Sequence, residues 1–237
     1  MAVKYADTYI ELQVEKRLPL YHAQKEALSK DIDKFLNGHK QMARQIIPIL
    51  EEADLEKPSS LDEQSPKIQK VYLEIASHFS KILAHHMAAF DEKQKKNFLQ
   101  KMREENDEMF QKGRKDRMEK VESRAKSFLG SLTNDQEKIL KDNRKIFDQQ
   151  IVTRSEKRSK LHSNFKTILE QEISVETKEQ MIHEAFVAYQ KESLSDRTNI
   201  EIAKTFMPTL NPAQKDYVRE QLGELQEILK YFVETAY

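Results

Sequence analysis

The chain has 237 residues, of which 34% are charged and 38% hydrophobic, with only 4 Gly, 6 Pro and no Cys. Turns in strand-rich folds need such breaker residues, so their scarcity predicts long helices and an all-α fold. The 40 basic and 40 acidic residues cancel, which excludes the basic excess of a dedicated nucleic-acid binder. No apolar run reaches the roughly 18 residues of a membrane-spanning helix, and the absence of Cys excludes disulfides and thiolate sites.

The N-terminal part predicts two helices followed by a linker. Apolar periodicity indicates helices over 3–17 and 22–47. Pro48 should end or kink the second helix, because proline lacks an N–H and clashes with the preceding turn. Residues 53–66 are rich in Pro, Ser and charge, which is typical of a linker.

A third helix is predicted to begin where the linker ends. Ser65-Pro66 would supply an N-cap followed by proline at the first helical position, with the helix running over 66–89. The whole chain, 1–237, is interpreted as one all-helical domain. It can be subdivided into 1–57 and 66–237, of which the second part holds the longest helices.

Two very long helices are predicted next, over 91–129 and 133–170. Each would span roughly 57 Å at the helical rise per residue. Only Gly130-Ser131-Leu132 separates them, so they should fold back as an antiparallel hairpin. Helices over 177–206 and 212–235 complete an elongated bundle of about seven helices, with Pro208 marking the end of the first of this pair.

One motif recurs at the helix starts: an apolar residue, an N-cap residue, two spacers and Gln. This is the pattern of a capping box, in which the N-cap side chain accepts the N3 backbone N–H and the Gln reaches back to the N-cap N–H. The three pairs of N-cap and Gln residues are Asp91 with Gln94, Thr133 with Gln136, and Asn211 with Gln214. A weaker fourth case is Thr177 with Gln180. Local helix capping alone explains the motif.

The stretch from Phe128 to Gln136, FLGSLTNDQ, resembles the Gly-x-Leu-Thr-x-x-Gln signature of a family of uncharacterised, all-helical bacterial envelope lipoproteins. The likeness extends to an N-terminal helix with Tyr and Asp, to Ala23-Gln24-Lys25 and to the start at Asp91. The Leu-Thr-x-x-Gln element also resembles the Spy and CpxP type of periplasmic stress chaperones, which are thin helical cradles. The resemblance implies a periplasmic protein, anchored by a lipidated Cys upstream of Met1.

The sequence contains no recognisable group of catalytic or ligand-binding residues, so we predict no catalytic, cofactor-binding or metal-binding residues. The seven His include no pair at the i, i+4 spacing of a helical metal site, and Glu-x-x-His is absent. The four Gly are isolated, which excludes a phosphate loop, and no Gly-x-Ser-x-Gly nucleophile motif occurs. Basic residues near Arg114 and Arg154 alternate with acids, so we expect no nucleic-acid partner.

A group of large apolar side chains on the first long helix is a candidate binding surface, because Met adapts to varied partners. Packing inside the bundle is the alternative role of these residues. They are Phe98, Met102, Met109, Phe110 and Met118. The leading hypothesis is a non-enzymatic envelope lipoprotein that acts as a binding or chaperone-like scaffold for a protein partner or unfolded clients. The alternatives are a structural module with one specific partner, in the envelope or the cytoplasm, and a metal or small-ligand enzyme. The oligomeric state is open.

The hairpin also predicts a charge register. A turn centred near Ser131 makes the numbers of facing residues sum to about 262. The predicted pairs are Glu104, Glu105 and Glu108 with Arg158, Lys157 and Arg154, and Arg114 and Arg117 with Asp148 and, more distantly, Asp142. The alternative is that these charges point outward toward a partner.

Overall fold

The computed structural model describes residues 6–234, and the fold is all-α. None of the described residues forms a β-strand. In chain order the helices are α1 (Ala6–Glu15), α2 (His22–Arg44), α3 (Ile46–Glu51), α4 (Ser60–Ala88), α5 (Glu92–Lys115), α6 (Arg117–Leu129), α7 (Asn134–Asp142), α8 (Arg144–Glu170), α9 (Val175–Leu194), α10 (Thr198–Phe206), the 3₁₀ turn η2 (Met207–Thr209) and α11 (Pro212–Glu234).

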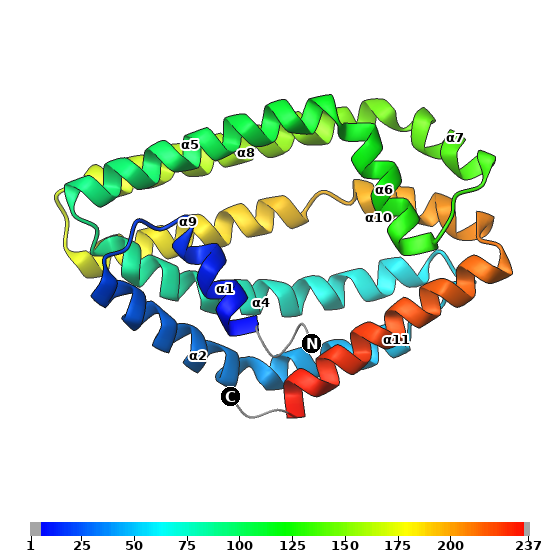
Figure 1. The fold of residues 1–237 in the computed structure, drawn as a ribbon, viewed down its shortest axis with the longest axis horizontal. Helices are drawn as coiled ribbons and strands as arrows, with labels where there is room; N and C mark the ends of the chain where they lie inside the picture. The colour runs from blue at the N-terminus through cyan, green and yellow to red at the C-terminus, as the bar shows by residue number, and fades with distance from the viewer. Residues whose placement is uncertain (1–5, 235–237) are drawn as a thin grey trace.

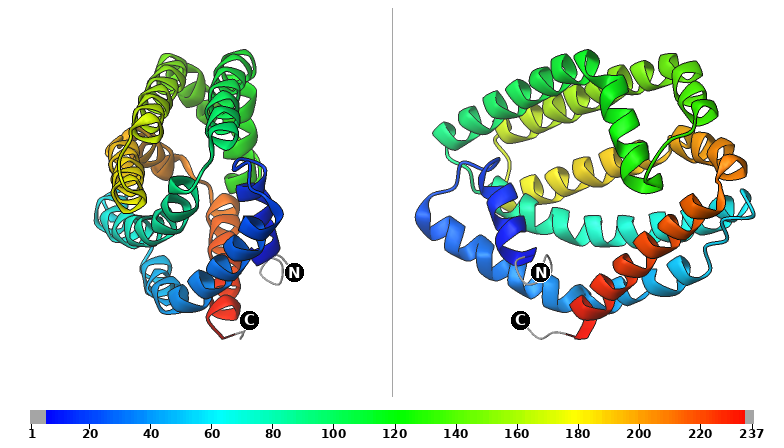
Figure 2. Two further views of the ribbon diagram at one scale, coloured as in Figure 1. Left: turned by 90° about the vertical axis from the view of Figure 1, so that its left-hand side faces the viewer. Right: turned by 45° about the vertical axis from the view of Figure 1, so that its right-hand side comes forward.

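The helices form a closed circuit that is elongated in one direction (Figure 1). The antiparallel helices α5 and α8 lie along one long edge, α9 packs against both α8 and α4, and α2 packs against α4. α11 packs against α2 and α6, and α6 leads back to α5, which closes the circuit. Figure 2 shows the same arrangement from two further directions, with α1 lying across one side. Helices of the N-terminal subdivision, 1–57, therefore contact both α4 and α11.

The predicted number of about seven helices is too low, because four predicted helices are each divided. The breaks fall at Gln45, at Asp116, at Asn143 and over 195–197. Asp116 and Asn143 both leave the helical region of the backbone, with φ/ψ of −112°/23° and −89°/7°. The predicted hairpin is consequently bent: α5 pairs with α8, while α6 and α7 turn away and contact each other.

The apolar residues of α6 and α7 give the physical reason for these bends. Met118 and Val121 of α6 pack with Leu140 of α7, Phe147 of α8 and Phe206 of α10 in a small second core. Straight continuations of α5 and α8 would carry these residues away from α10. Burying apolar surface against α10 stabilises the bend, at the expense of a few helical hydrogen bonds.

The helix break predicted at Pro48 is confirmed, although it lies three residues before the proline, at Gln45. The ring and missing N–H of the proline affect the carbonyl four residues before it, which belongs to Arg44, the last residue of α2. The helical end predicted near Pro208 is confirmed, since α10 ends at Phe206 and η2 follows.

The predicted helix start at Ser65-Pro66 is wrong, because α4 begins at Ser60 and contains Pro66. Tertiary contacts hold the turns before the proline in place. The Ser60 hydroxyl donates to the Asp54 carbonyl at 2.9 Å, and the carboxylate of Asp62 binds Lys204 of α10 at 2.8 Å. The linker is correspondingly shorter than 53–66.

The main core lies at the end of the molecule where α2 and α5 begin. It is built from α1, α2, α4, α5, α8 and α9, and Phe165, Leu28 and Ile32 are almost fully buried in it. The second core, between α6, α7, α8 and α10, is much smaller. In the described part of the chain, no helix is both long and apolar enough to cross a membrane.

Candidate ligand-binding pocket

The three predicted capping boxes are present. Asp91 and Thr133 each accept the backbone N–H of the Gln three residues on, at 2.8 and 3.3 Å, and each Gln accepts the N–H of its N-cap residue. Asn211 and Gln214 make the same two hydrogen bonds, at 2.9 and 3.1 Å. The Asp91 carboxylate also accepts the Tyr21 hydroxyl, and these bonds, the Gln94 N–H foremost, lower the pKa of Asp91.

The glutamines also join helix starts that are far apart in the sequence. The amides of Gln136 and Gln214 donate to each other's oxygen at 3.0 and 2.9 Å. Gln94 donates to Gln24 at 2.6 Å, and Gln24 in turn accepts the N–H of Tyr21 at the start of α2. We call Gln24 with Gln94 the first glutamine pair, and Gln136 with Gln214 the second glutamine pair. They lie at opposite ends of the molecule, as the helix starts in Figure 1 show.

The weaker fourth case of the motif is wrong. Ser174, not Thr177, is the N-cap of α9, and its hydroxyl accepts the Thr177 N–H at 3.2 Å. Gln180 lies inside the helix and donates to Glu184. The motif lacked an apolar residue in front of Thr177, and Ser174 offers a capping oxygen one turn earlier.

Next to the main core, five helices surround an apolar pocket of about 430 Å³. This volume lies within the range of about 300–1,000 Å³ that is typical of small-molecule sites. The apolar and aromatic side chains of its wall come from α1, α4, α5, α8 and α9 and the turn after α1. They are Tyr9, Ile10, Val14, Leu18, Phe79, Leu83, Phe98, Met102, Leu161, Phe165, Phe186 and Tyr189.

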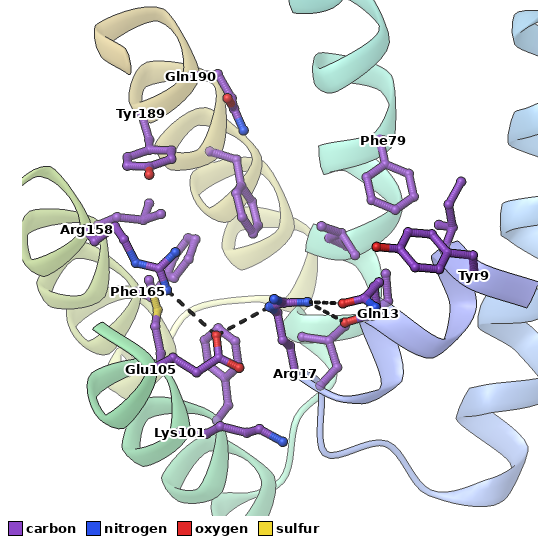
Figure 3. Close-up of a pocket in the computed structure, with 18 residues that line it drawn as sticks. Tyr9, Gln13, Arg17, Phe79, Lys101, Glu105, Arg158, Phe165, Tyr189 and Gln190 are labelled. Carbon is purple, nitrogen blue, oxygen red and sulfur yellow. Dashed lines mark hydrogen bonds and ion pairs between the residues drawn. The ribbon is translucent and has the colours of Figure 1, made fainter. Parts of the chain in front are cut away.

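The charged side chains of the wall gather on one side of this pocket (Figure 3). Figure 3 shows the Glu105 carboxylate between Arg17 and Arg158, with ion-pair distances of 3.3 and 3.7 Å. Arg17 also donates to the backbone and side-chain oxygens of Gln13, at 2.8 and 3.2 Å. The Nε of Arg158 is buried and has no hydrogen-bond partner. With Lys101, the wall holds three cations and one carboxylate, a formal excess of two positive charges.

The candidate binding surface divides in the structure. Phe98 and Met102 line the pocket, where Phe98 is buried and Met102 half-buried. Met109 and Phe110 are half-buried further along α5, with the Arg114 guanidinium over the Phe110 ring. Met118 belongs to the second core. The bend at Asp116 separates Met118 from the others, so the five residues form no single surface.

Among the described residues, none of the three predicted pairs of glutamate and base forms an ion pair, but one ion pair lies a single residue out of the predicted register. Glu105, which was predicted to face Lys157, pairs with Arg158, and their numbers sum to 263. In the described part of the chain this ion pair is the one that joins α5 to α8. Glu104 instead accepts from Gln100, and Glu108 pairs with Lys112, because partners one turn away on the same helix lie closer.

The predicted neighbours of Arg117 and Arg114 are found in part. Asp148 is close enough to Arg117 to favour its charged form, but the ion pair of Asp148 is with Arg144. Arg117 donates to Gln150 at 3.0 Å and lies over the Phe147 ring, and Arg114 lies over the Phe110 ring. Burial lowers the pKa of Arg117, and the nearby Arg124 and Arg154 lower it further. The bend at Asp116 turns Arg117 onto the aromatic face of α8.

Several His side chains join helices through hydrogen bonds. His39 and His78 lie 2.6 Å apart between α2 and α4, His183 bonds Ser80, and the buried His86 bonds Asp31 at 3.0 Å. Burial is the largest cause that lowers the pKa of His183. Among the described residues, no group of three or more His, Cys, Asp or Glu could hold a metal ion.

Sequence reasoning proposed two of the pocket residues, Phe98 and Met102, as binding residues and missed most of the others. Phe79, Phe186 and Tyr189 were missed because periodicity marks buried residues and does not separate a pocket wall from a filled core. Arg17 carried no signal, since it follows α1 in a charged segment. The charge register did place Glu105 near Arg158.

Comparison of the chain with protein-family models, with curated proteins and with solved structures finds no match in any of the three.

Proposed function

We propose that this protein is a non-enzymatic binding scaffold, which holds the apolar part of a ligand in the pocket between α1, α4, α5, α8 and α9. The observation that carries the proposal is the apolar cavity of about 430 Å³ at the edge of the main core. Its wall combines aromatic rings with Met102 and a few polar groups on one side. Such a combination is typical of ligand sites, where polar groups orient an apolar ligand.

Binding of N-phenyl-1-naphthylamine, a neutral dye that fluoresces in apolar surroundings, tests the pocket. Met102→Trp should fill the cavity and weaken binding about tenfold or more, because the dye can no longer bury the apolar surface that the indole covers, which is worth roughly 1.5–3 kcal/mol for one side chain. Met109→Trp is the matched control, because Met109 lies on the same helix outside the pocket, and it should bind the dye as the unaltered protein does. Equal binding by both variants, or none by the unaltered protein, would refute the proposal.

A chaperone-like role is one form of this function, in which the pocket takes apolar side chains of unfolded clients. The position of Met102 in the wall supports it, because Met adapts to ligands of different shape. The test is the aggregation of a model client. The Met109→Trp variant should protect the client and Met102→Trp should not. Capture of one stoichiometric partner, without protection of clients, would favour a specific interaction module.

An envelope location is proposed on the resemblance of the Gly-x-Leu-Thr-x-x-Gln element at Gly130–Gln136 to the lipoprotein family. The pairing of these motifs in the structure supports a helical scaffold of that kind. Fractionation of the native host and the mass of the native protein's N-terminus test the anchor. A protein found in the cytoplasmic fraction without a lipid would overturn this part of the proposal.

A further inference from the structure

We propose that the ligand of the pocket is a single-chain amphipathic anion, with an apolar chain and a carboxylate or phosphate at one end. The inference rests on the proposed function and adds the chemical class of the ligand. It starts from the unequal distribution of polarity in the pocket, where the aromatic and aliphatic side chains surround the cavity and the charged groups lie on one side.

Arg158 has hydrogen-bonding capacity that the protein does not use. A guanidinium carries five N–H donors, and the only ion pair of Arg158 in the described part of the chain is the long one, 3.7 Å, to Glu105. Its side chain is 24% exposed, and its Nε is buried without a partner. The Nε itself is out of reach of a ligand, but the other N–H groups of this partly exposed guanidinium border the cavity. An anionic oxygen bound there would give them an acceptor stronger than the distant Glu105 carboxylate.

The charges near Arg158 favour an anion over a cation or a neutral group. Arg17 and Lys101 stand on the same wall, and Glu105 is the one carboxylate among the residues that line the pocket. Arg17 already donates to Gln13 and forms an ion pair with Glu105. We therefore assign Arg158 the main contact to the ligand's anionic end and Arg17 a weaker electrostatic role. Guanidinium and carboxylate or phosphate oxygens form the stronger class of hydrogen bonds.

The size of the cavity favours a small ligand over a folded partner. At about 430 Å³ it is in the lower part of the range for small-molecule sites, and side chains of five helices bound it. One flexible apolar chain can lie among Phe165, Leu83 and Phe186, while the anionic end stays at Arg158. An anionic membrane surface also carries phosphate groups that Arg158 could bind. Its lipid chains, however, would stay in the bilayer and leave the apolar cavity unfilled.

The experiment compares dodecanoate with dodecanol, two ligands that share the chain and differ in the charged end, by displacement of the neutral dye. The unaltered protein should prefer dodecanoate about tenfold, as expected for a hydrogen bond to a charged group. Arg158→Gln should abolish the preference by weakening the binding of dodecanoate much more than that of dodecanol. Arg154→Gln is the matched control, because Arg154 lies one turn earlier on α8 and does not line the pocket.

A second variant keeps the test independent of the folding of Arg158→Gln. Glu105→Gln removes the carboxylate that competes for both arginines, so dodecanoate should bind about threefold more tightly, the order expected for a partly exposed ion pair. Dodecanol should be unaffected. Dodecyl phosphate should behave as dodecanoate does.

The outcomes separate the two proposals. Displacement by dodecanol and dodecanoate alike, with no change in Arg158→Gln, would overturn the anionic ligand and leave the apolar pocket in place. Failure of both ligands and of the neutral dye would overturn the binding function itself. A further experiment sediments the protein with phosphatidylglycerol vesicles and adds dodecanoate as a competitor. If the protein sediments and dodecanoate does not reduce its sedimentation, the protein binds a membrane surface, and the single-chain ligand is overturned.

Discussion

The two glutamine pairs use one motif to join helix starts at opposite ends of the molecule, but they differ in completeness. In the second pair both amides donate and accept, and Gln136 and Gln214 are 0% and 3% exposed. In the first pair Gln94 is 2% exposed and donates to Gln24, whereas Gln24 is half-buried and makes no return bond.

Each donating glutamine also reaches the backbone of the other helix start. Gln94 donates to the Pro19 carbonyl, Gln136 to that of Thr209 and Gln214 to that of Ser131. Each carbonyl lies two residues before the partner's N-cap. The comparison shows that the Gln of this motif serves two purposes: it caps its own helix and binds the turn before another.

The more complete pair lies beside the smaller core. The first pair lies beside the main core, which buries side chains from six helices. The second pair lies beside the small core, which has three buried members. A buried polar network makes the packing most rigid and specific when every polar group in it has a hydrogen-bond partner. We infer that the second pair contributes a larger share of the stability at its end.

The largest expected effect is therefore at the second pair. Gln136→Leu leaves the Thr133 N–H, the Thr209 carbonyl and the Gln214 amide without this partner, and should destabilise by about 3 kcal/mol, at 1–3 kcal/mol per stranded buried group with partial relaxation. Gln214→Leu should cost about the same. Urea denaturation measures both, with the exposed Gln180→Leu as control. A loss below that of Gln94→Leu would contradict the comparison.

The first pair should respond asymmetrically. Gln94→Leu strands the Asp91 N–H and the Pro19 carbonyl and should cost about 2 kcal/mol. Gln24→Leu should cost about 1 kcal/mol or less, because water can reach the half-buried groups that it leaves. The ratio of the two losses in urea denaturation is the measurement. Equal losses would show that the first pair is as complete as the second.

The local part of the motif can be separated from the long-range part at Thr133. Thr133→Ala removes the hydroxyl that accepts the Gln136 N–H but leaves the Gln136–Gln214 pair. It should cost about 1 kcal/mol, the usual value for an N-cap, without abolishing the fold. Thermal denaturation followed by circular dichroism checks the value. A loss as large as that of Gln136→Leu would mean that the cap positions the pair.

Two glycines inside helices allow a test of whether the glutamine pairs act independently of the helices that begin there. Gly38 lies in α2, which begins at the first pair, and Gly223 lies in α11, which begins at the second. An added Cβ at Gly38 of α2 or at Gly223 of α11 would meet nothing within 4 Å. Gly38→Ala and Gly223→Ala should each stabilise by about 0.5–1 kcal/mol through helix propensity. In urea denaturation each gain should add to the loss from Gln94→Leu or Gln136→Leu. Non-additive values would reveal coupling to the pairs.

The smallest expected effect is a difference in the pH dependence of stability between the two ends of the molecule. The N-cap Asp91 carries a titratable carboxylate, whereas the N-cap Thr133 carries none. The Gln94 N–H and the Tyr21 hydroxyl hold the pKa of Asp91 below its ordinary value. This contribution is present above about pH 4, the unfolded range, and is lost as the pH falls through the lowered pKa.

The measurement for Asp91 is the urea midpoint between neutral and acidic pH. Asp91→Asn should keep the cap and reduce the fall of the midpoint in acid, and Asn211→Asp should increase the fall. An unchanged acid dependence in both variants would show that the ionised carboxylate adds nothing to the cap.

The sequence by itself determined the helical character, the capping boxes at Asp91, Thr133 and Asn211, and the approximate register that brings Glu105 to Arg158. These features depend on composition, on residues within one turn, or on a tight turn that fixes which residues face each other. The predicted boundaries were wrong where tertiary contacts outweigh local preference, as at Ser60, Asp116 and Asn143.

Only the tertiary structure decided which helix starts are joined and where the pocket lies. Gln94 and Gln24 are 70 residues apart, and Gln136 and Gln214 are 78. No local pattern selects one partner among four similar motifs. The pocket wall draws on five helices, and a half-buried aromatic such as Phe186 has the same periodicity as a core residue. Whether such a residue lines the pocket or fills the core depends on how all five helices pack around the cavity.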